Sequence, residues 1–339
     1  MTEKEIVEAV AKLTNEQKSR LKMLLAKILG AGEGKNYSIE ERFRNGLICP
    51  RCKARRVSRN GRRRGVQRYV CRSCGSTFNA ATGTVLAATK KSVSVWECYV
   101  ECMVSGLSVR MSAEKCGISK STSFIWRHKL LDALREKDAK AMLRGIVEGD
   151  EAFFRLSFKG NHARDGFRMP RPARKRGGCG KRGMSSEQVC APCAVERGGA
   201  ALSKAACLGR ATARALGDVF GGKIDGGATF CSDAHASYRA FAAERSVRLV
   251  QTRGGRAKSG IYHTQHVSAY HSVLKGWMRR FRGVATKYLD NYLAWNNALN
   301  WPGGASTERR NDFLVFVLTA LKRVLSKNVS KRPAVPFRV

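Results

Sequence analysis

Two Cys-x2-Cys pairs place the strongest single constraint on how this chain can fold. Cys49 and Cys52 form the first pair, Cys71 and Cys74 form the second, and eighteen residues separate them. Each pair can present two thiolates to one tetrahedral zinc ion, and the span between the pairs is long enough for a hairpin. The alternative is four unrelated buried cysteines. The matched spacing favours a structural zinc ribbon over residues 46–80, in which four sulfurs leave no coordination position open for catalysis.

The segment between these pairs is strongly basic and contains no acid. Four of its arginines are the expected phosphate contacts: Arg55, Arg62, Arg63 and Arg64. The whole chain has 64 Lys and Arg against 26 Asp and Glu, a formal net charge of +38. Such an excess repels itself unless a polyanion neutralises it, and nucleic acid is the commonest polyanion. We expect double-stranded DNA, because we find no aromatic-interleaved motif of the kind that stacks single-stranded RNA bases.

The N-terminal segment, residues 1–45, is predicted to form short amphipathic helices. Charged residues interrupt its apolar positions, so it is neither a signal peptide nor a membrane span. Thr14 and Gln17 have the spacing of a capping box ahead of a leucine-rich run. Without an export signal, we expect a cytoplasmic protein without a membrane partner.

In a reducing cytoplasm, the twelve cysteines are expected to be metal ligands or small core residues instead of disulfides. Cys190 and Cys193 form a third Cys-x2-Cys pair, but no partner pair lies nearby. They occur in a strand-like run, which favours core packing over metal or redox chemistry. Cys98, Cys102 and Cys116 are likewise interpreted as small hydrophobic residues.

Residues 81–143 are predicted to contain a helix-turn-helix. A short helix over 108–116 and a longer one over 120–134 flank a tight turn at 117–119, and Ser119 or Ser121 can cap the second helix. The alternative is an ordinary helical bundle, but the neighbouring basic ribbon favours DNA binding. The residues expected to face a groove are Lys120, Ser121, Ser123, Arg127 and Lys129.

Two aspartates lie within apolar, strand-like runs of the next zone, residues 144–300. Asp150 is inside the run 146–154, and Asp233 ends the run 228–233. An aspartate in such a run is costly unless it binds a metal or pairs with a base, and two on neighbouring strands suit an oxygen-preferring ion such as Mg²⁺. Each aspartate could equally be a strand-end cap.

The order of elements in this zone favours a ribonuclease H-like α/β domain within a multidomain α+β chain. Its expected strands are 146–154, 189–195, 200–207, 228–233 and 247–252, and its expected helices are 211–220 and 236–243. A basic loop over 155–188 interrupts the order and carries Arg174, Lys175 and Arg176 as further DNA contacts. Residues 301–339 are predicted to form a C-terminal helix and a basic tail.

Several longer motifs resemble one family. The matching stretches are WRHKLL at 126–131, DEAFF at 150–154, RKRGG at 174–178, CSD at 231–233 and YHTQHVSAYHSVLKGWMRR at 262–280. Together with the ribbon, the chain resembles the DDE/N insertion-sequence transposases of the ISXO-like group from about residue 49 to residue 295. The resemblance implies an enzyme that binds terminal inverted repeats and catalyses Mg²⁺-dependent DNA cleavage and strand transfer.

The resemblance also implies roles for particular residues. Asp150 and Asp233 correspond to the first two carboxylates that hold two Mg²⁺ ions, and Lys275 matches a family lysine that can contact DNA phosphate near them. The third ligand of the family, Asn or Glu, is replaced by Ser268, whose hydroxyl is shorter and neutral. The residues that could substitute are Gln265, His266 and His271. The family further implies a homodimer or a larger synaptic complex.

Ser268 keeps a second function open. A chain with a weakened or inactive site could remain a transposase-derived DNA-binding protein, because the ribbon and the helix-turn-helix serve both functions equally well. Only residues 144–300, which contain the two aspartates and Ser268, distinguish the two possibilities.

Overall fold

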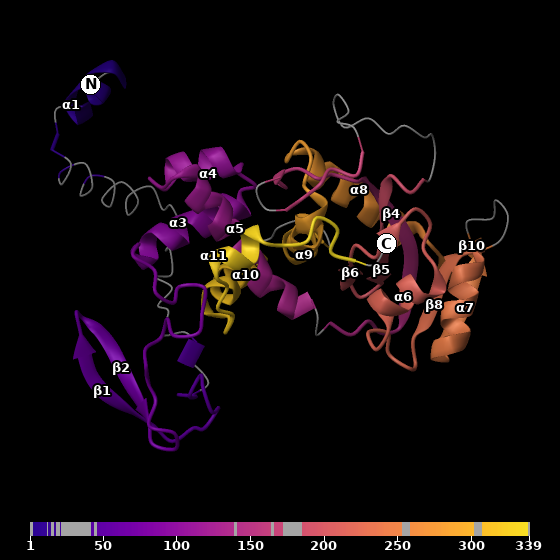
Figure 1. Cartoon of the computed structure of the whole chain (residues 1–339), viewed down its shortest axis with the longest axis horizontal. Helices are drawn as coiled ribbons and strands as arrows, with labels where there is room; N and C mark the ends of the chain where they lie inside the picture. The colour runs from indigo at the N-terminus through magenta and orange to yellow at the C-terminus, as the bar shows by residue number, and fades with distance from the viewer. Residues whose placement is uncertain are drawn as a thin grey trace.

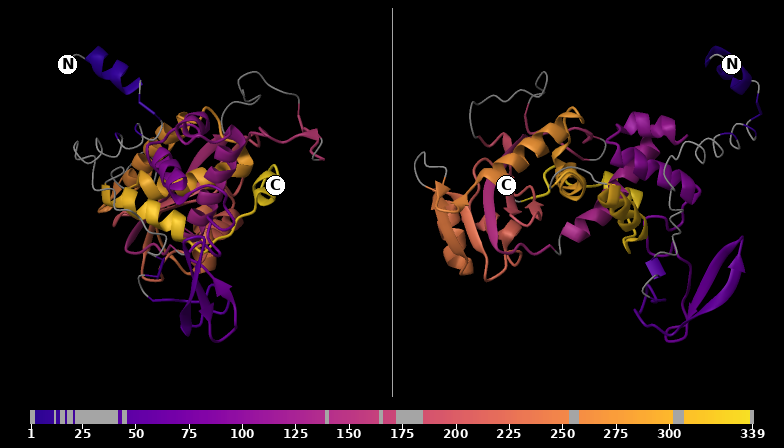
Figure 2. Two further views of the ribbon diagram at one scale, coloured as in Figure 1. Left: turned by 90° about the vertical axis from the view of Figure 1, so that its left-hand side faces the viewer. Right: turned by 180° about the vertical axis from the view of Figure 1, so that it is seen from behind.

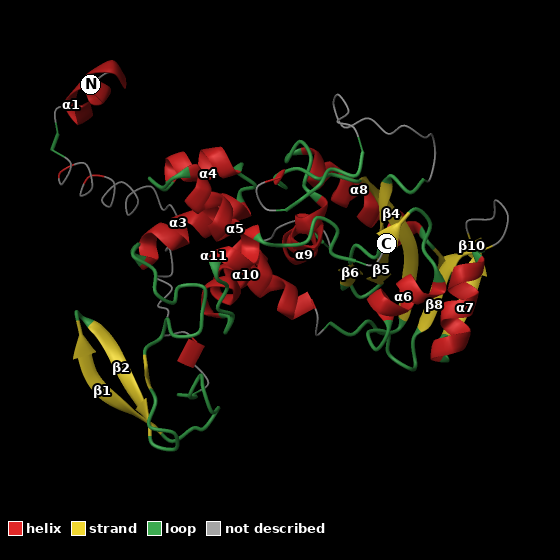
Figure 3. Cartoon of the chain, in the orientation of Figure 1, coloured by secondary structure: helices red, strands yellow, loops and turns green. Residues whose placement is uncertain are grey.

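The structure is a computed structural model that describes residues 3–11, 13, 14, 17, 21, 42, 43, 46–138, 141–163, 166–171, 185–252, 258–301 and 307–337. Within these ranges, strands lie at two ends of the molecule and helices lie between them (Figures 1 and 3). The predicted contacts Arg174, Lys175 and Arg176 lie outside the described residues, as does most of the segment 1–45. No helix in the described part is long and apolar enough to cross a membrane.

The N-terminal segment begins with α1, Glu3–Ala11. The capping box that follows it is confirmed. The backbone N–H of Thr14 donates to Oε1 of Gln17 at 2.9 Å, and the backbone N–H of Gln17 donates to Oγ1 of Thr14 at 3.3 Å. Each residue thus satisfies a backbone donor of the other, as the sequence spacing predicted.

The four-cysteine segment folds around a three-stranded antiparallel sheet of β1 (Val57–Arg63), β2 (Val66–Cys71) and β3 (Thr77–Phe78). Arg64 and Gly65 form the turn between the first two strands, both with positive φ, as short hairpin turns require. The hairpin projects away from the helices in every view (Figures 1 and 2). The expected hairpin between the cysteine pairs is therefore confirmed.

The next segment is helical and confirms the predicted helix–turn–helix pattern. It contains α3 (Val93–Val104), α4 (Val109–Lys115) and α5 (Lys120–Asp138). The α4–α5 turn contains Gly117 in the left-handed region at φ +59°. Ser119 caps the second helix, since its Oγ accepts the backbone N–H of Thr122 at 3.1 Å.

The larger sheet has the order β6-β5-β4-β8-β9, with β7 also paired to β5. The central strand β4 runs antiparallel to β5 and parallel to β8. Four expected strand positions are confirmed within a residue or two. The bounds are β4 Ile146–Arg155, β5 Gln188–Glu196, β6 Ala201–Ser203, β7 Cys207–Leu208, β8 Thr229–Asp233 and β9 Arg248–Thr252.

The single strand expected over residues 200–207 is wrong, because it is split into β6 and β7. The break lies opposite Pro192 of β5. Lys204 donates its backbone N–H to the carbonyl of Pro192, but proline has no N–H to return the bond. The next residue, Ala205, donates instead to Oδ1 of Asp290 at 2.8 Å. Proline therefore interrupts the ladder at this edge of the sheet.

Helices cover both faces of the sheet, so the domain has three layers (Figure 1). On one face lie α6 (Ala213–Phe220) and α7 (Ala236–Arg245), in one core with Val147 and Phe230. On the other lie α8 (Gln265–Arg279) and α9 (Leu289–Leu299), in one core with Ala152 and Val189. Short elements complete this region: β10 Lys258–Ser259, β11 Tyr262–His263 and η4 Thr286–Tyr288.

The C-terminal helices α10 (Thr307–Thr319) and α11 (Ser326–Ser330) both contact α5. They share one hydrophobic cluster with α3, α5 and α9, and this cluster contains Trp96, Trp126, Trp277 and Trp295. The cluster crosses the boundaries expected near residues 143 and 300. The helix-turn-helix, the end of the α/β domain and the C-terminal helices therefore bury one common core (Figure 2).

Candidate functional site

Asp150 and Asp233 lie on adjacent parallel strands. Glu148 of β4 pairs in register with Cys231 of β8, and the two aspartates follow two residues later on each strand. Asp233 is exposed, and the side chain of Asp150 is 38% exposed. The strand register therefore brings together the two carboxylates that the sequence singled out, at a place that solvent can reach.

Burial and charge act on both acids of β4 at this position. Burial, together with the negative charge of Asp233, raises the pKa of Asp150, while Lys275 opposes the shift. Burial also raises the pKa of Glu151 to about 7, with Asp150 and Asp233 adding to the shift. Glu151 was not among the predicted site residues, although it directly follows Asp150 in β4. The feature of the sequence that could have indicated Glu151 is a second acidic residue within a strand-like apolar run.

Glu148 joins β4 to the start of α8. It is fully buried, and its Oε2 accepts the backbone N–H of His266 at 2.7 Å and that of Val267 at 3.3 Å. Its Oε1 lies 2.8 Å from Nδ1 of His266, 3.2 Å from Nδ1 of His263 and 3.2 Å from Nε of Arg197. A carboxylate here compensates the unpaired N–H groups and the positive end of the helix dipole. Glu148 thus fixes the helix that faces Asp150.

Of the three α8 residues that the sequence offered in place of the third ligand, Gln265 is exposed, His266 contacts Glu148 and His271 lies beside Asp150. Ser268 is exposed, and its Oγ donates to the backbone carbonyl of Thr264 at 2.9 Å, so its hydroxyl is bound to its own helix. Nδ1 of His271 lies 3.6 Å from Oδ2 of Asp150. Burial and the charge of Lys275 lower the pKa of His271 to about 4, so its imidazole is neutral near pH 7.

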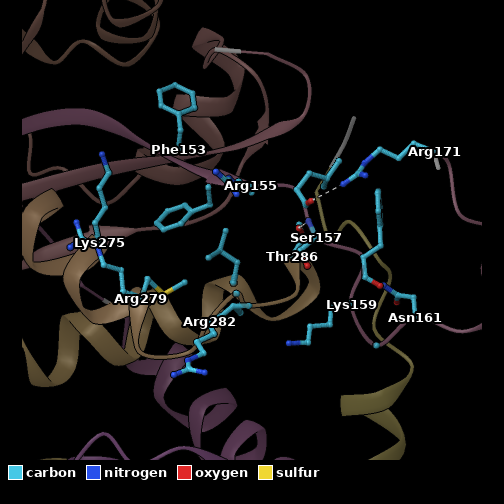
Figure 4. Close-up of a pocket in the computed structure, with 18 of the residues that line it drawn as sticks. Phe153, Arg155, Ser157, Lys159, Asn161, Arg171, Lys275, Arg279, Arg282 and Thr286 are labelled. Atoms are coloured by element: carbon cyan, nitrogen blue, oxygen red, sulfur yellow. Dashed lines mark hydrogen bonds between the residues drawn. The ribbon is translucent and has the colours of Figure 1, made fainter. Parts of the chain in front are cut away.

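A cavity of about 1100 Å³ extends from Lys275 along α8 and the end of β4 (Figure 4). Its described lining includes no acidic residue. The basic side chains that line it are Arg155, Lys159, Arg171, Lys275, Arg279 and Arg282. In the close-up, Lys275 and Arg279 belong to one helix on one side of the cavity, and Lys159 and Asn161 lie across from them. A cavity with this lining is suited to a polyanion.

The four cysteines of the ribbon converge. Sγ of Cys49 lies 3.8 Å from Sγ of Cys74, and Sγ of Cys52 lies 3.5 Å from Sγ of Cys71. All four sulfurs are within 4.8 Å of one another. Sulfurs bonded to one tetrahedral zinc ion at about 2.3 Å lie about 3.8 Å apart. The donor set and its spacing therefore fit a structural zinc ion.

The helix-turn-helix places only some of its predicted contacts on the surface. Lys120 and Ser121 are exposed at the start of α5, and Lys129 is half-buried. Ser123 and Arg127 are buried, which corrects their assignment to a DNA surface. A guanidinium nitrogen of Arg127 donates to the carbonyl of Leu107 at 2.7 Å. Its guanidinium also lies over the ring of Trp295. This arginine holds helices together.

The remaining cysteines fall into two groups. Cys190 and Cys193 are fully buried in β5, as expected for core residues, and Cys190 pairs with Cys207 of β7. Cys98, Cys102 and Cys116 were expected to be separate small hydrophobes, but their sulfurs form one cluster within 4.8 Å. The sequence contained only part of this signal, the four-residue spacing of Cys98 and Cys102 on one helix face.

Comparisons with known proteins assign residues 142–295 to the family described as the ISXO2-like transposase domain. A protein of Halobacterium salinarum, described as uncharacterized and located in the transposable element ISH50, is 28% identical over 263 residues, which cover 76% of this chain and 86% of that protein.

A chain from the crystal structure of a pre-cleavage Mos1 transpososome is also similar at 10% identity, covering 92% of this chain and 99% of that one. Its TM-score is 0.21, which does not indicate a shared overall fold. The family match includes both aspartates, α8 and the basic lining of the cavity. Residues 142–295 of this chain are therefore similar to the ISXO2-like transposase domain.

Proposed function

We propose that this protein is a DNA transposase that binds the terminal inverted repeats of an insertion sequence and carries out Mg²⁺-dependent cleavage and strand transfer. The observation that carries the proposal is the approach of Asp150 and Asp233 on β4 and β8, inside the segment that matches a transposase domain. The strand order β6-β5-β4-β8-β9 supports a ribonuclease H-like fold for this segment.

Asp150 and Asp233 would hold the ions, because carboxylate oxygens are the ligands that Mg²⁺ prefers. Bound there, two Mg²⁺ ions would supply Lewis-acid activation and charge neutralisation at a DNA phosphodiester. Glu148 keeps α8 against β4, so that the charge of Lys275 stays close enough to oppose the rise in the pKa of Asp150 that burial causes. As a fixed cation, Lys275 would position a phosphate by charge.

Three basic surfaces would position the rest of the DNA. The ribbon presents Arg55, Arg62, Arg63 and Arg64, all exposed. The start of α5 presents Lys120 and Ser121. The cavity beside Lys275 would take the DNA backbone next to the cleaved bond. Two element ends must be joined in transposition, so we propose that the working form is a homodimer or a larger synaptic complex.

The experiment that tests catalysis is nicking of DNA that contains the inverted repeats flanking the coding sequence, with and without Mg²⁺. Asp150→Ala and Asp233→Ala should each abolish nicking. Asp218→Ala removes an exposed acid on α6, away from the proposed site, and should leave the rate unchanged. Nicking that survives both active-site substitutions would contradict the assignment.

DNA binding is tested separately by salt dependence and charge reversal. Affinity should fall steeply with salt, with a log-log slope of about −0.9 per phosphate neutralised. Arg279→Glu should weaken binding, because it reverses a charge in the cavity. Arg239→Glu on α7 is the matched control, since it reverses an exposed charge on the opposite face of the sheet. Equal losses in both variants would argue against the cavity as the DNA site.

A second function is favoured by one observation. The hydroxyl of Ser268 is hydrogen-bonded within α8, so it offers a poor substitute for an Asn or Glu ligand. A chain with this substitution could bind element ends without cutting them, as a transposase-derived DNA-binding protein. Tight, salt-sensitive binding of the inverted repeats without Mg²⁺-dependent nicking would support this second function over the first.

A further inference from the structure

Three cysteines meet within the helix-turn-helix, apart from both the ribbon and the carboxylates. Cys98 and Cys102 lie one turn apart on the same face of α3, and Cys116 is the C-cap of α4. Sγ of Cys116 is 3.6 Å from Sγ of Cys98 and 3.8 Å from Sγ of Cys102. The three sulfurs all lie within 4.8 Å of one another.

The spacing of these sulfurs matches that of the ribbon in the same chain. There, Sγ of Cys49 lies 3.8 Å from Sγ of Cys74, and Sγ of Cys52 lies 3.5 Å from Sγ of Cys71. Four thiolates that bind one zinc ion at about 2.3 Å lie about 3.8 Å apart, and a three-thiolate site has similar spacing. Sulfurs in a disulfide would lie at about 2.05 Å, so the cluster is arranged as separate thiols around a common centre.

Other cysteines in the described part of the chain show that ordinary core packing looks different. Cys193 is fully buried, and its Sγ lies 3.2 Å from the backbone carbonyl of Ala191. Cys190 and Cys207 form only a pair across two strands. In the cluster, by contrast, Cys102 is buried while Cys98 and Cys116 are half-buried, and the three sulfurs lie within 4.8 Å of one another.

We propose that Cys98, Cys102 and Cys116 form a second zinc site, in which three thiolates bind one Zn²⁺ and water occupies the fourth position. No His, Asp, Glu or further Cys joins the group among the described residues, which leaves the fourth position to solvent. Binding forms three Zn–S bonds and releases three thiol protons, without any redox change. Burial raises the pKa of the Cys102 thiol, and the positive charge of Lys115 opposes that rise.

The site would fasten α3 to the turn before α5. Cys116 directly precedes Gly117 of this turn, and the exposed residues Lys120 and Ser121 follow it. An ion held by both helices would fix the angle between α3 and α4, and with it the position of the α5 N-terminus. This zinc would be structural support for the DNA-binding unit, and it does not depend on whether the chain is catalytic.

Metal content of the full-length protein tests the proposal. Purified under reductant and saturated with Zn²⁺, the chain should retain about two zinc equivalents after desalting, one per thiolate site. Cys116→Ser and Cys52→Ser should each remove about one equivalent, and the double variant should remove both. Cys207→Ser is the matched control, because this half-buried cysteine belongs to neither site and should leave the zinc content unchanged.

A wild-type chain that retains about one equivalent, unchanged by Cys116→Ser, would overturn the proposal. If Cys116→Ser does not fold, as judged by circular dichroism, the wild-type protein still gives an answer. Peptide-resolved alkylation should show Cys98 and Cys116 protected with Zn²⁺ and reactive after chelation. Equal alkylation rates in the two states would also overturn the site. Neither measurement involves DNA, so the result is independent of transposase activity.

Discussion

The carboxylate of Glu148 accepts the backbone N–H of His266 at 2.7 Å, so that the strand containing Asp150 holds the first turn of the helix containing Lys275. Glu148→Gln keeps the size of this side chain but removes its charge. We expect a loss of about 1–3 kcal/mol in the free energy of unfolding, because a buried charged acceptor and its partner Arg197 lose their pairing.

The same substitution should lower Mg²⁺-dependent nicking more than it lowers DNA binding. Glu148 acts through the position of α8, so it is a positioning residue for Asp150 and Lys275. Urea unfolding, a nicking assay and a binding assay on one preparation separate these effects. If nicking falls only in proportion to the unfolded fraction, Glu148 serves stability alone.

Gly149 lies between Glu148 and Asp150 on β4, where the packing leaves no space for a side chain. A Cβ built at this position would lie 2.2 Å from Cζ of Phe230, which packs against it from β8. Gly149→Ala should therefore destabilise the domain by roughly 1–3 kcal/mol, as overpacked cores do. Gly276→Ala is the matched control, since a Cβ there meets nothing within 4 Å on α8. It should be neutral or stabilising by about 1 kcal/mol. Thermal unfolding of both variants tests the pair.

Much of this site could be predicted from the sequence, because it depends on local patterns. Apolar runs placed Asp150 and Asp233 on strands, and the parallel pairing of β4 with β8 then aligned them. His271 was one of three residues offered in place of the third ligand, but the sequence did not indicate which of them reaches Asp150, because that depends on how α8 lies across the sheet. Tertiary packing fixes that helix through Glu148 and through Tyr270, whose hydroxyl lies 2.7 Å from Oγ of Ser203.

Arg127 shows why the DNA-facing side chains were predicted less well. Its place on a basic helix indicated a surface contact, but Trp295 of α9 covers that face of α5.

The cluster of Cys98, Cys102 and Cys116 also depends on packing between helices. Cys98 and Cys102 share a helix face by their spacing, whereas Cys116 joins them only through the angle between α3 and α4. Contacts between distant segments set both outcomes, and no local pattern encodes them.

Removal of zinc from the ribbon should unfold that segment alone. Its buried core is small and includes Tyr69, Phe78 and two of the four cysteines, so little apolar burial remains without the ion. Zinc contributes about 10–16 kcal/mol to the folding of comparable small domains. In Cys52→Ser, hydrogen exchange should become fast across β1 and β2 but stay slow across β4 and β5. Loss of protection in β4 as well would show that the ribbon is coupled to the α/β domain.

Acid should destabilise the helical core through His128. Burial, with the charges of Arg332, Arg127 and Lys287, lowers its pKa well below the usual value. The folded state therefore holds His128 neutral, while the unfolded chain binds a proton below about pH 6.5. The contribution of neutral His128 to the free energy of unfolding is fully present above about pH 6.5. It is lost as the pH falls from the pKa of His128 in the unfolded chain toward its lower pKa in the folded protein.

His128→Phe should flatten this dependence. The ring of His128 stacks on Tyr288 with centroids 4.0 Å apart, and phenylalanine can keep that contact. Urea unfolding at several pH values should show a shallower decline below about pH 6.5 in the variant, by up to about 1.4 kcal/mol per pH unit. Parallel curves for the two proteins throughout the acid range would exclude His128 as the source.

The hydroxyl of Ser268 should contribute nothing to catalysis, because it is hydrogen-bonded to the carbonyl of Thr264. Ser268→Ala should nick DNA at the wild-type rate. Ser272→Ala is the matched control, since its exposed hydroxyl also donates to a carbonyl four residues earlier on α8. His271→Ala, in contrast, removes the imidazole nearest Asp150 and should lower the rate.

Ser268→Asn should increase Mg²⁺-dependent nicking, because a longer side chain with a carbonyl oxygen can reach away from its own helix toward an ion held by Asp150 and Asp233. Nicking rates at several Mg²⁺ concentrations are the measurement, since a gained ligand should also lower the Mg²⁺ concentration needed for half-maximal rate. A large loss in Ser268→Ala, together with no gain in Ser268→Asn, would show that serine itself serves the site. The chain would then be a transposase with an unusual third residue, because its activity would depend on the hydroxyl.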